Sequence, residues 1–188
     1  SAAPHAYRNP RIAPDGRRVA VVFLDSPAQV WIYDLARGTL TRLTFPGGGV
    51  PTWTPDGSEW PFKWVTNILV TADGSSKAEQ LITGRPGASA TSFSPDGQLL
   101  AFVEDNPTTG ADLLVLRLSD RKAQPFLRTP FGESFACFSP DGHWIAYASN
   151  ESGVEEVFVR SFPGPGGKWK ISTASGKFPT WSRNGREL

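Results

Sequence analysis

Phe138-Ser139-Pro140-Asp141-Gly142-His143-Trp144-Ile145-Ala146-Tyr147 is the stretch that decides the fold. Proline presets φ for the first central position of a β-turn, aspartate favours the second, and glycine adopts a positive φ at low cost. The aromatic residue before the turn ends one strand, and the β-branched and aromatic run after it begins another. The stretch therefore predicts a β-hairpin.

The same phrase recurs along the chain. Its other copies are Ile12–Gly16, Trp53–Gly57, Phe93–Gly97 and a degraded copy at Trp181–Gly185. The turn residues Asp15, Asp56, Asp96, Asp141 and Asn184 follow one another at intervals of 41, 40, 45 and 43 residues. A fixed period near 40 in a strand-rich chain indicates a propeller or solenoid array.

Each period holds four predicted strands. The first ends at the aromatic residue of the phrase. Second strands are expected at 19–23, 99–103 and 144–148, third strands at 30–35, 113–118 and 157–162, and fourth strands at 41–44, 79–82, 124–127 and 168–171. Four antiparallel strands make one propeller blade. A β-sandwich also has short strands, but it does not repeat one phrase at one period.

The predicted fold class is therefore all-β: a β-propeller segment of four four-stranded antiparallel blades plus the first strand of a fifth, from a larger propeller. Residues 1–8 are expected to be a tag or linker. The predicted blades span 9–45, 50–83, 90–128 and 135–173, and the next begins at 178–188. The second blade departs from the pattern. Pro61 stands in its second strand, where an irregularity or bulge is expected, and its next hairpin is several residues short.

Composition excludes some classes of function. Nineteen basic and 18 acidic residues give a formal charge of +1, without a run of like charge. Neither a nucleic-acid-binding stripe nor an acidic tail is indicated. No apolar stretch approaches the 18 residues of a membrane span.

A catalytic or cofactor site is not predicted. A hydrolase needs an activated nucleophile with a base in reach, but His5 lies in the expected linker and His143 follows a turn glycine. The segment Gly132–Ala136 lacks the final glycine of a nucleophile elbow and runs into a strand. The segment Gly164–Trp169 has a tryptophan where a phosphate loop needs serine or threonine. The repeated aspartates are interpreted as turn residues, so no metal site is expected.

The propeller geometry offers one place for a binding site, the mouth of the central channel. The first strand of each blade lines the central channel. The positions four residues before each aromatic are Arg8, Gly49, Ser89, Ser134 and Lys177, with Asn9, Arg11 and Glu133 as neighbours. Such a ring could hold a peptide or an anion, but polar residues are expected wherever water fills a channel, so water alone is the favoured interpretation. The candidate binding residues are Arg8, Arg11, Ser89, Glu133, Ser134 and Lys177.

From about Asn9 to Leu188 the repeat resembles the WD-like propeller repeat of TolB-type proteins. The resemblance implies a bacterial protein-docking propeller in the periplasm or another extracytoplasmic compartment. Similar repeats occur in the substrate-gating propellers of prolyl-oligopeptidase-type serine peptidases and in the propeller tails of bacterial serine/threonine kinases. The segments Asn150–Gly153 and Phe162–Trp169 are most similar to the kinase tails.

The predicted function is a non-catalytic module that binds a protein, peptide or other ligand without a cofactor. A substrate-gating propeller of a serine peptidase and a sensor or scaffold tail of a kinase remain open as alternatives. The segment Gly185–Leu188 matches the opening of a second strand, so self-association of the fragment through unpaired strand edges is also expected.

Overall fold

The computed structural model describes residues 6–24, 28–43, 51–57, 59–62, 68–71, 79–82, 84–85 and 87–188. These residues form fifteen β-strands and no helix, so the chain is all-β where it is described. None of the described residues forms a helix that is long and apolar enough to cross a membrane. The chain divides into two compact units, residues 1–84 and 85–188.

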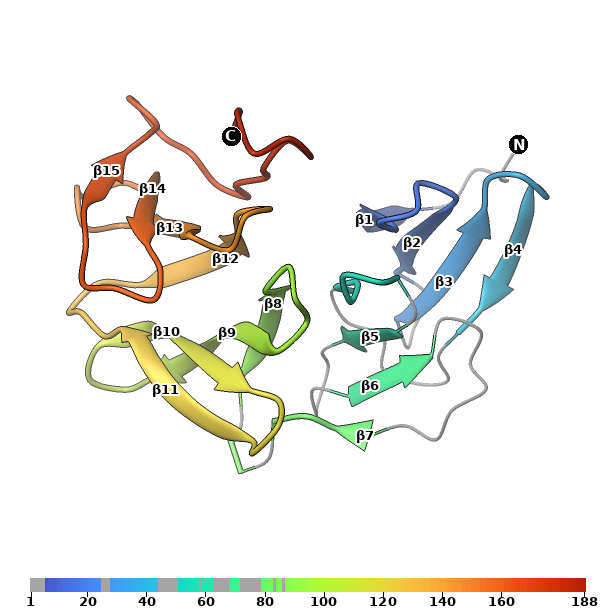
Figure 1. Ribbon diagram of the computed structural model, residues 1–188, viewed down its shortest axis with the longest axis horizontal. Coiled ribbons are helices and arrows are strands. Elements are labelled where there is room, and N and C mark those ends of the chain that lie inside the picture. The colour runs from blue at the N-terminus through green and yellow to red at the C-terminus, as the bar shows by residue number, and fades with distance from the viewer. Residues whose placement is uncertain are drawn as a thin grey trace. The chain divides into compact units, whose positions relative to one another are not determined.

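The first unit contains two antiparallel sheets (Figure 1). The first sheet consists of β1 (Tyr7–Ile12), β2 (Arg18–Phe23), β3 (Gln29–Asp34) and β4 (Thr39–Arg42), in chain order. The second sheet has three described strands, β5 (Glu59–Phe62), β6 (Ile68–Thr71) and β7 (Glu79–Gln80).

The second unit contains two four-stranded antiparallel sheets. The third sheet consists of β8 (Ser89–Phe93), β9 (Leu99–Asn106), β10 (Gly110–Arg117) and β11 (Lys122–Leu127). The fourth consists of β12 (Glu133–Phe138), β13 (Trp144–Ser149), β14 (Glu156–Ser161) and β15 (Lys168–Lys170). In both sheets each strand pairs with its neighbours in sequence, which is the meander expected of a propeller blade.

The repeated phrase forms the predicted turns. In the fourth sheet Gly142 has φ +75°, and its N–H donates to the carbonyl oxygen of Ser139 at 3.0 Å. Asp141 Oδ1 accepts from Ser139 Oγ at 2.5 Å and from the N–H of His143 at 3.0 Å. These two hydrogen bonds lower the pKa of Asp141. The Asp141 carboxylate therefore stabilises the turn in which it lies, as the sequence predicts.

The turns of successive repeats also pack on one another. A Cβ added to Gly142 would lie 3.5 Å from Cδ of Pro95, and one added to Gly185 would lie 3.7 Å from Cδ of Pro140. In the first unit the same relationship joins Gly57 to Pro14, at 3.4 Å. The proline of one turn thus contacts the glycine of the next, so the phrase both closes a hairpin and stacks adjacent repeats.

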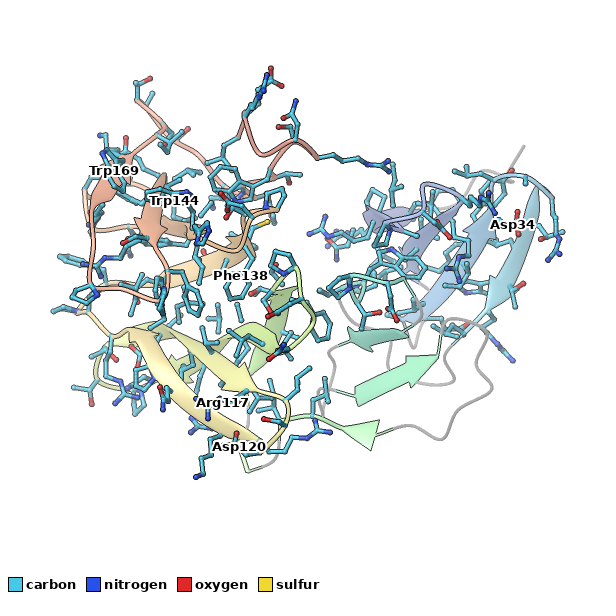
Figure 2. All side chains as sticks on the ribbon, in the orientation of Figure 1. Asp34, Arg117, Asp120, Phe138, Trp144 and Trp169 are labelled. Atoms are coloured by element: carbon cyan, nitrogen blue, oxygen red, sulfur yellow. The ribbon has the colours of Figure 1, made fainter. Side chains whose placement is uncertain are left out.

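Apolar side chains pack between the third and fourth sheets. Phe138, labelled in Figure 2, lies in this core and contacts Phe162 edge-on at 5.0 Å between ring centroids. The buried members of the core are Ala101, Leu113, Val115, Leu127, Ala136, Phe138, Ile145, Tyr147 and Phe158. Burial of each large side chain contributes about 2 kcal/mol, so this core holds the two sheets together.

Two of the predicted first strands do not form. Residues 51–54 and 178–181 are not in strands, although the turns that follow them are present. Both segments carry a proline two residues before the tryptophan, Pro51 and Pro179, and proline has no N–H to donate to a ladder. Pro10 holds the same position in β1, where a bulge accommodates it. The described residues therefore give three four-stranded sheets and one three-stranded sheet.

Two smaller expectations are also corrected. Pro61 does not distort its strand, because β5 pairs with β6 without a register shift and is an edge strand of the described sheet. An edge position tolerates the missing N–H. β1 begins at Tyr7, so Tyr7 and Arg8 belong to a strand and not to a linker. His5, Gly49 and the short hairpin at 63–67 lie outside the described residues.

Candidate functional site

A β-bulge recurs in the first strand of three sheets. In β12, Ser134 pairs with Ala148 and Cys137 with Ala146, so two residues of β12 oppose one residue of β13. β1 and β8 show similar register shifts. Bulges bend a strand and re-aim its side chains, and they are frequent next to functional sites.

The bulge of β12 places an aromatic residue in the left-handed region. Phe135 has φ +53°, and Phe178, at the same position of the next repeat, has φ +56°. The equivalent residue of β1 is Asn9, with φ +50°. Asparagine adopts this conformation readily, whereas a bulky aromatic residue does so at a cost of about 1–2 kcal/mol. Two phenylalanines are therefore held in a strained backbone conformation.

The rings of these two phenylalanines form a pair. Their centroids are 4.0 Å apart, and the ring planes are tilted by 45°. Phe135 is half-buried, whereas Phe178 is 57% exposed. The pair therefore presents aromatic surface to solvent beside the start of β12.

Hydrogen bonds and an ion pair connect the loops around this pair to the hairpin between β13 and β14. The N–H of Gly132 donates to Oδ1 of Asn150 at 2.9 Å, and the N–H of Gly176 donates to the carbonyl oxygen of Glu155 at 2.9 Å. Glu155 also forms an ion pair with Lys177. We call the residues 128–135, 150–156 and 172–178 the loop end of the fourth sheet; these contacts join its three segments.

Glu133 is one of two buried acids of the loop end, the other being Glu156. Its side chain is 1% exposed, Thr129 Oγ1 donates to its Oε1, and its Oε2 is buried without a hydrogen-bond partner. Burial raises the pKa of Glu133 to about 7, and the nearby carboxylates of Asp112 and Glu151 act in the same direction. Glu133 therefore titrates near neutral pH.

Two other buried acids stabilise hairpins. Asp112 is fully buried and accepts hydrogen bonds from Asn106, Thr109 and Arg128 at 2.7–2.9 Å. Burial alone would raise the pKa of Asp112, but these three donors lower it. Glu156 occupies the equivalent position of β14, and hydrogen bonds from Lys170 and Ser152 lower its pKa. Both acids are satisfied within the protein.

The structure places the predicted binding residues as follows. Arg8 and Arg11 are exposed on β1, in the first unit. The other four, Ser89, Glu133, Ser134 and Lys177, belong to the second unit. Glu133 and Ser134 begin β12, and Lys177 precedes Phe178, whose ring contacts that of Phe135. Ser89 is the half-buried first residue of β8.

Sequence reasoning did not identify the aromatic pair, nor Asn150 and Glu155 as the residues that fasten the loops. A signal was present, because Asn9 occupies the same repeat position as Phe135 and Phe178, and asparagine there favours a positive φ. Ser134 lies within a strand and not at a strand–helix turn. Among the residues that the structure describes, no three His, Cys, Asp or Glu side chains gather as metal ligands do.

No protein-family model matches this sequence, and no curated protein matches it. Solved structures do match. A putative TolB from Agrobacterium tumefaciens superposes with a TM-score of 0.84 at 16% identity, over 97% of this chain and 68% of that one. TolB from Acinetobacter baumannii gives 0.82 at 21% identity, over 99% of this chain and 48% of that one. The fold is that of a TolB-type β-propeller.

The TolB-type fold is shared with other propellers. A prolyl endopeptidase structure matches with a TM-score of 0.65 at 17% identity, over 89% of this chain and 29% of that one. This TolB-type segment spans about two thirds of the Agrobacterium chain and about half of the Acinetobacter chain. The likeness establishes the propeller architecture, while the number of blades in the whole protein stays a prediction.

Proposed function

We propose that this chain is a non-catalytic propeller module that binds a protein or peptide partner. The loop end of the fourth sheet carries the proposal. Asn150 and Glu155 connect its three segments through hydrogen bonds and an ion pair, so the surface is already ordered in the unbound chain. Preorganised loops lose little conformational entropy on binding.

The side chains exposed on this surface suit a protein partner. Phe131, Val154 and Phe178 are 40%, 51% and 57% exposed. Each of the three segments of the loop end thus carries one exposed apolar side chain, and exposed apolar patches mark interaction sites. The same loops carry the predicted residues Glu133, Ser134 and Lys177. An apolar centre with polar neighbours is the usual anatomy of a protein–protein interface.

Selection from a phage-displayed library of random 12-residue peptides tests this function. The immobilised 188-residue chain is expected to enrich peptides that bind reversibly and are recovered uncleaved after prolonged incubation. Cleavage of the peptides would instead indicate a catalytic role. Failure to enrich any peptide over an empty surface would contradict the proposal.

A substrate-gating propeller is the second candidate. The likeness to the prolyl endopeptidase structure supports it, because that chain combines a segment of this fold with a much longer polypeptide. The sequence of the complete gene decides between the two: a Gly-x-Ser-x-Gly hydrolase domain would favour gating. A kinase domain with a glycine-rich loop would favour the kinase-tail alternative, which stays a prediction.

A further inference from the structure

We propose that a pocket between the third and fourth sheets binds a small organic carboxylate, which pairs with Arg160. The pocket has a volume of about 360 Å³, within the range of small-ligand sites. It lies at the opposite end of the fourth sheet from the loop end, so the inference goes beyond the proposed binding function. β11 and the hairpin between β14 and β15 form its two sides (Figure 1). Pro125 and Phe126 line one side, and Arg160, Ser161 and residues 163–166 line the other.

The connection between β14 and β15 is longer than its counterparts. It comprises residues 162–167, whereas residues 35–38 and 118–121 make the corresponding connections of the first and third sheets. Gly166 lies directly against the end of β14, because a Cβ added to it would collide with Oγ of Ser161. Only glycine permits so close an approach. The glycine-rich loop therefore folds back on its strand and forms one wall of the pocket.

Arg160 stands at a position that is apolar in the preceding repeat. It lies two residues beyond the core residue Phe158, so both side chains are on the face of β14 that packs against the third sheet. Phe162, further along the same face, contacts Phe126 of β11 at 5.7 Å between ring centroids. The counterpart of Arg160 in β10 is Leu116, which is 2% exposed. Arg160 is itself partly buried, and a guanidinium that is removed from water calls for an anionic partner.

No acidic residue pairs with Arg160 in the part of the chain that the structure describes. Other bases of these two sheets do have such partners. Lys168, which is opposite Arg160 on β15, forms an ion pair with Glu151. Arg117, at the end of β10, forms one with Asp120, and both residues are labelled in Figure 2. The guanidinium of Arg160 is therefore the group of the pocket that remains to be neutralised.

A carboxylate with an apolar body fits these surroundings. The planar guanidinium matches the two oxygens of a carboxylate, with which arginine forms paired hydrogen bonds. The rings of Pro125, Phe126 and Pro163 supply apolar walls for the rest of the molecule. A phosphate carries up to two negative charges and would call for a second cation, but the nearby Lys168 is already paired with Glu151. A monocarboxylate is therefore the favoured occupant.

Nuclear magnetic resonance of the ¹⁵N-labelled 188-residue chain tests the site with phenylacetate as the probe. The backbone amide signals of Phe126, Ser161 and Gly166 are expected to shift in a saturable way. Phenylacetamide has the same shape without the charge, so it is expected to bind at least about tenfold more weakly. Arg160→Leu installs the residue found at the equivalent position of β10; it should fold and should bind phenylacetate at least about tenfold more weakly. Arg117→Leu is the matched control, because Arg117 does not line the pocket, and it should retain the affinity.

Equal affinities for phenylacetate and phenylacetamide would overturn the proposal, and this comparison needs no variant to fold. Unchanged affinity in Arg160→Leu would overturn it as well. So would the absence of shifts at the pocket at about 10 mM phenylacetate, where even a millimolar complex is largely formed. Tighter binding of inorganic phosphate, or of the peptide acetyl-Gly-Glu-Gly-amide, would overturn it in favour of another anion or of an acidic protein partner. The peptide selection that tests the proposed function uses different ligands, so either proposal can fail without the other.

Discussion

The indole Nε1 of Trp181 donates a hydrogen bond to the carbonyl oxygen of Cys137, one repeat earlier, at 3.2 Å. Trp53 makes the same contact with the carbonyl oxygen of Arg11, at 3.0 Å. Phe138 has no side-chain donor, and its backbone N–H instead donates to Ser92 Oγ of the preceding repeat, at 3.1 Å. In these three repeats the aromatic position of the phrase is therefore where the repeat is hydrogen-bonded to the one before it.

Trp181→Phe keeps an aromatic ring but removes the indole donor. The free energy of unfolding is expected to fall by about 1 kcal/mol, the usual net worth of one hydrogen bond. Trp169→Phe is the matched control, because the exposed Trp169 contacts Trp144 through its ring. In Figure 2 these two tryptophans lie close together on the fourth sheet. Urea denaturation measures both variants, and equal losses would contradict the role given to the Trp181 N–H.

Gly142→Val is expected to destabilise the protein by about 1–3 kcal/mol. A β-branched residue tolerates the φ of +75° poorly, whereas the added Cβ itself would make only an ordinary contact with Cδ of Pro95, at 3.5 Å. The neighbouring exposed residue gives the control, since His143→Val places a side chain of the same shape at a residue without a positive φ. Thermal melts that shift equally for the two variants would refute the assignment of Gly142 to a positive-φ turn position.

Glu133→Gln is expected to stabilise the protein at alkaline pH and to change little at pH 5. The folded state raises the pKa of Glu133 from 4.5 to about 7, so it binds the proton more tightly than the unfolded chain. Stability from this group is therefore fully present below about pH 4.5 and is lost as the pH rises through 7. A shift of this size corresponds to about 3 kcal/mol, which the uncharged glutamine should recover at pH 8.

Glu156→Gln is expected to change the stability with the opposite pH dependence. The folded state lowers the pKa of Glu156 through Lys170 and Ser152, so its contribution is present above the unfolded pKa and is lost as the pH falls through the folded value. This variant should be destabilised at pH 8 and should approach the wild type under strongly acidic conditions. Denaturation curves at several pH values check both variants; a stabilising effect of Glu156→Gln at pH 8 would contradict the assignment.

The isolated chain is expected to show no esterase, peptidase or nucleotide-hydrolysis activity. Ser134 lies in β12 and not at the strand–helix turn that activates a serine nucleophile. Ser134→Ala is the decisive variant: turnover that is present in the wild type and disappears in this variant would show that Ser134 is catalytic. Any turnover that both proteins share belongs to a contaminant or to another site.

The sequence by itself determined the repeat, its period and its hairpins. Proline, aspartate and glycine act through local backbone preferences, so the turn at Gly142 is encoded within a few residues and could be predicted. The same locality explains the predicted strands, which match β2, β3, β9, β10, β13 and β14 closely. The first strands expected around Trp53 and Trp181 do not form, whereas β1 forms with a proline at the same repeat position, so the local sequence does not decide whether this segment pairs.

Only the tertiary structure decided what those hairpins bring together. The ring contact between Phe135 and Phe178 and the hydrogen bond from Trp181 to Cys137 join residues about 40 positions apart. The burial of Glu133 depends on neighbours from another sheet. The ionisation of Glu133 is likewise a property of its surroundings, since an exposed glutamate in the same sequence would titrate normally. Local preferences fix turns and strands, whereas contacts between repeats fix the environment of each side chain, and that environment makes the candidate site.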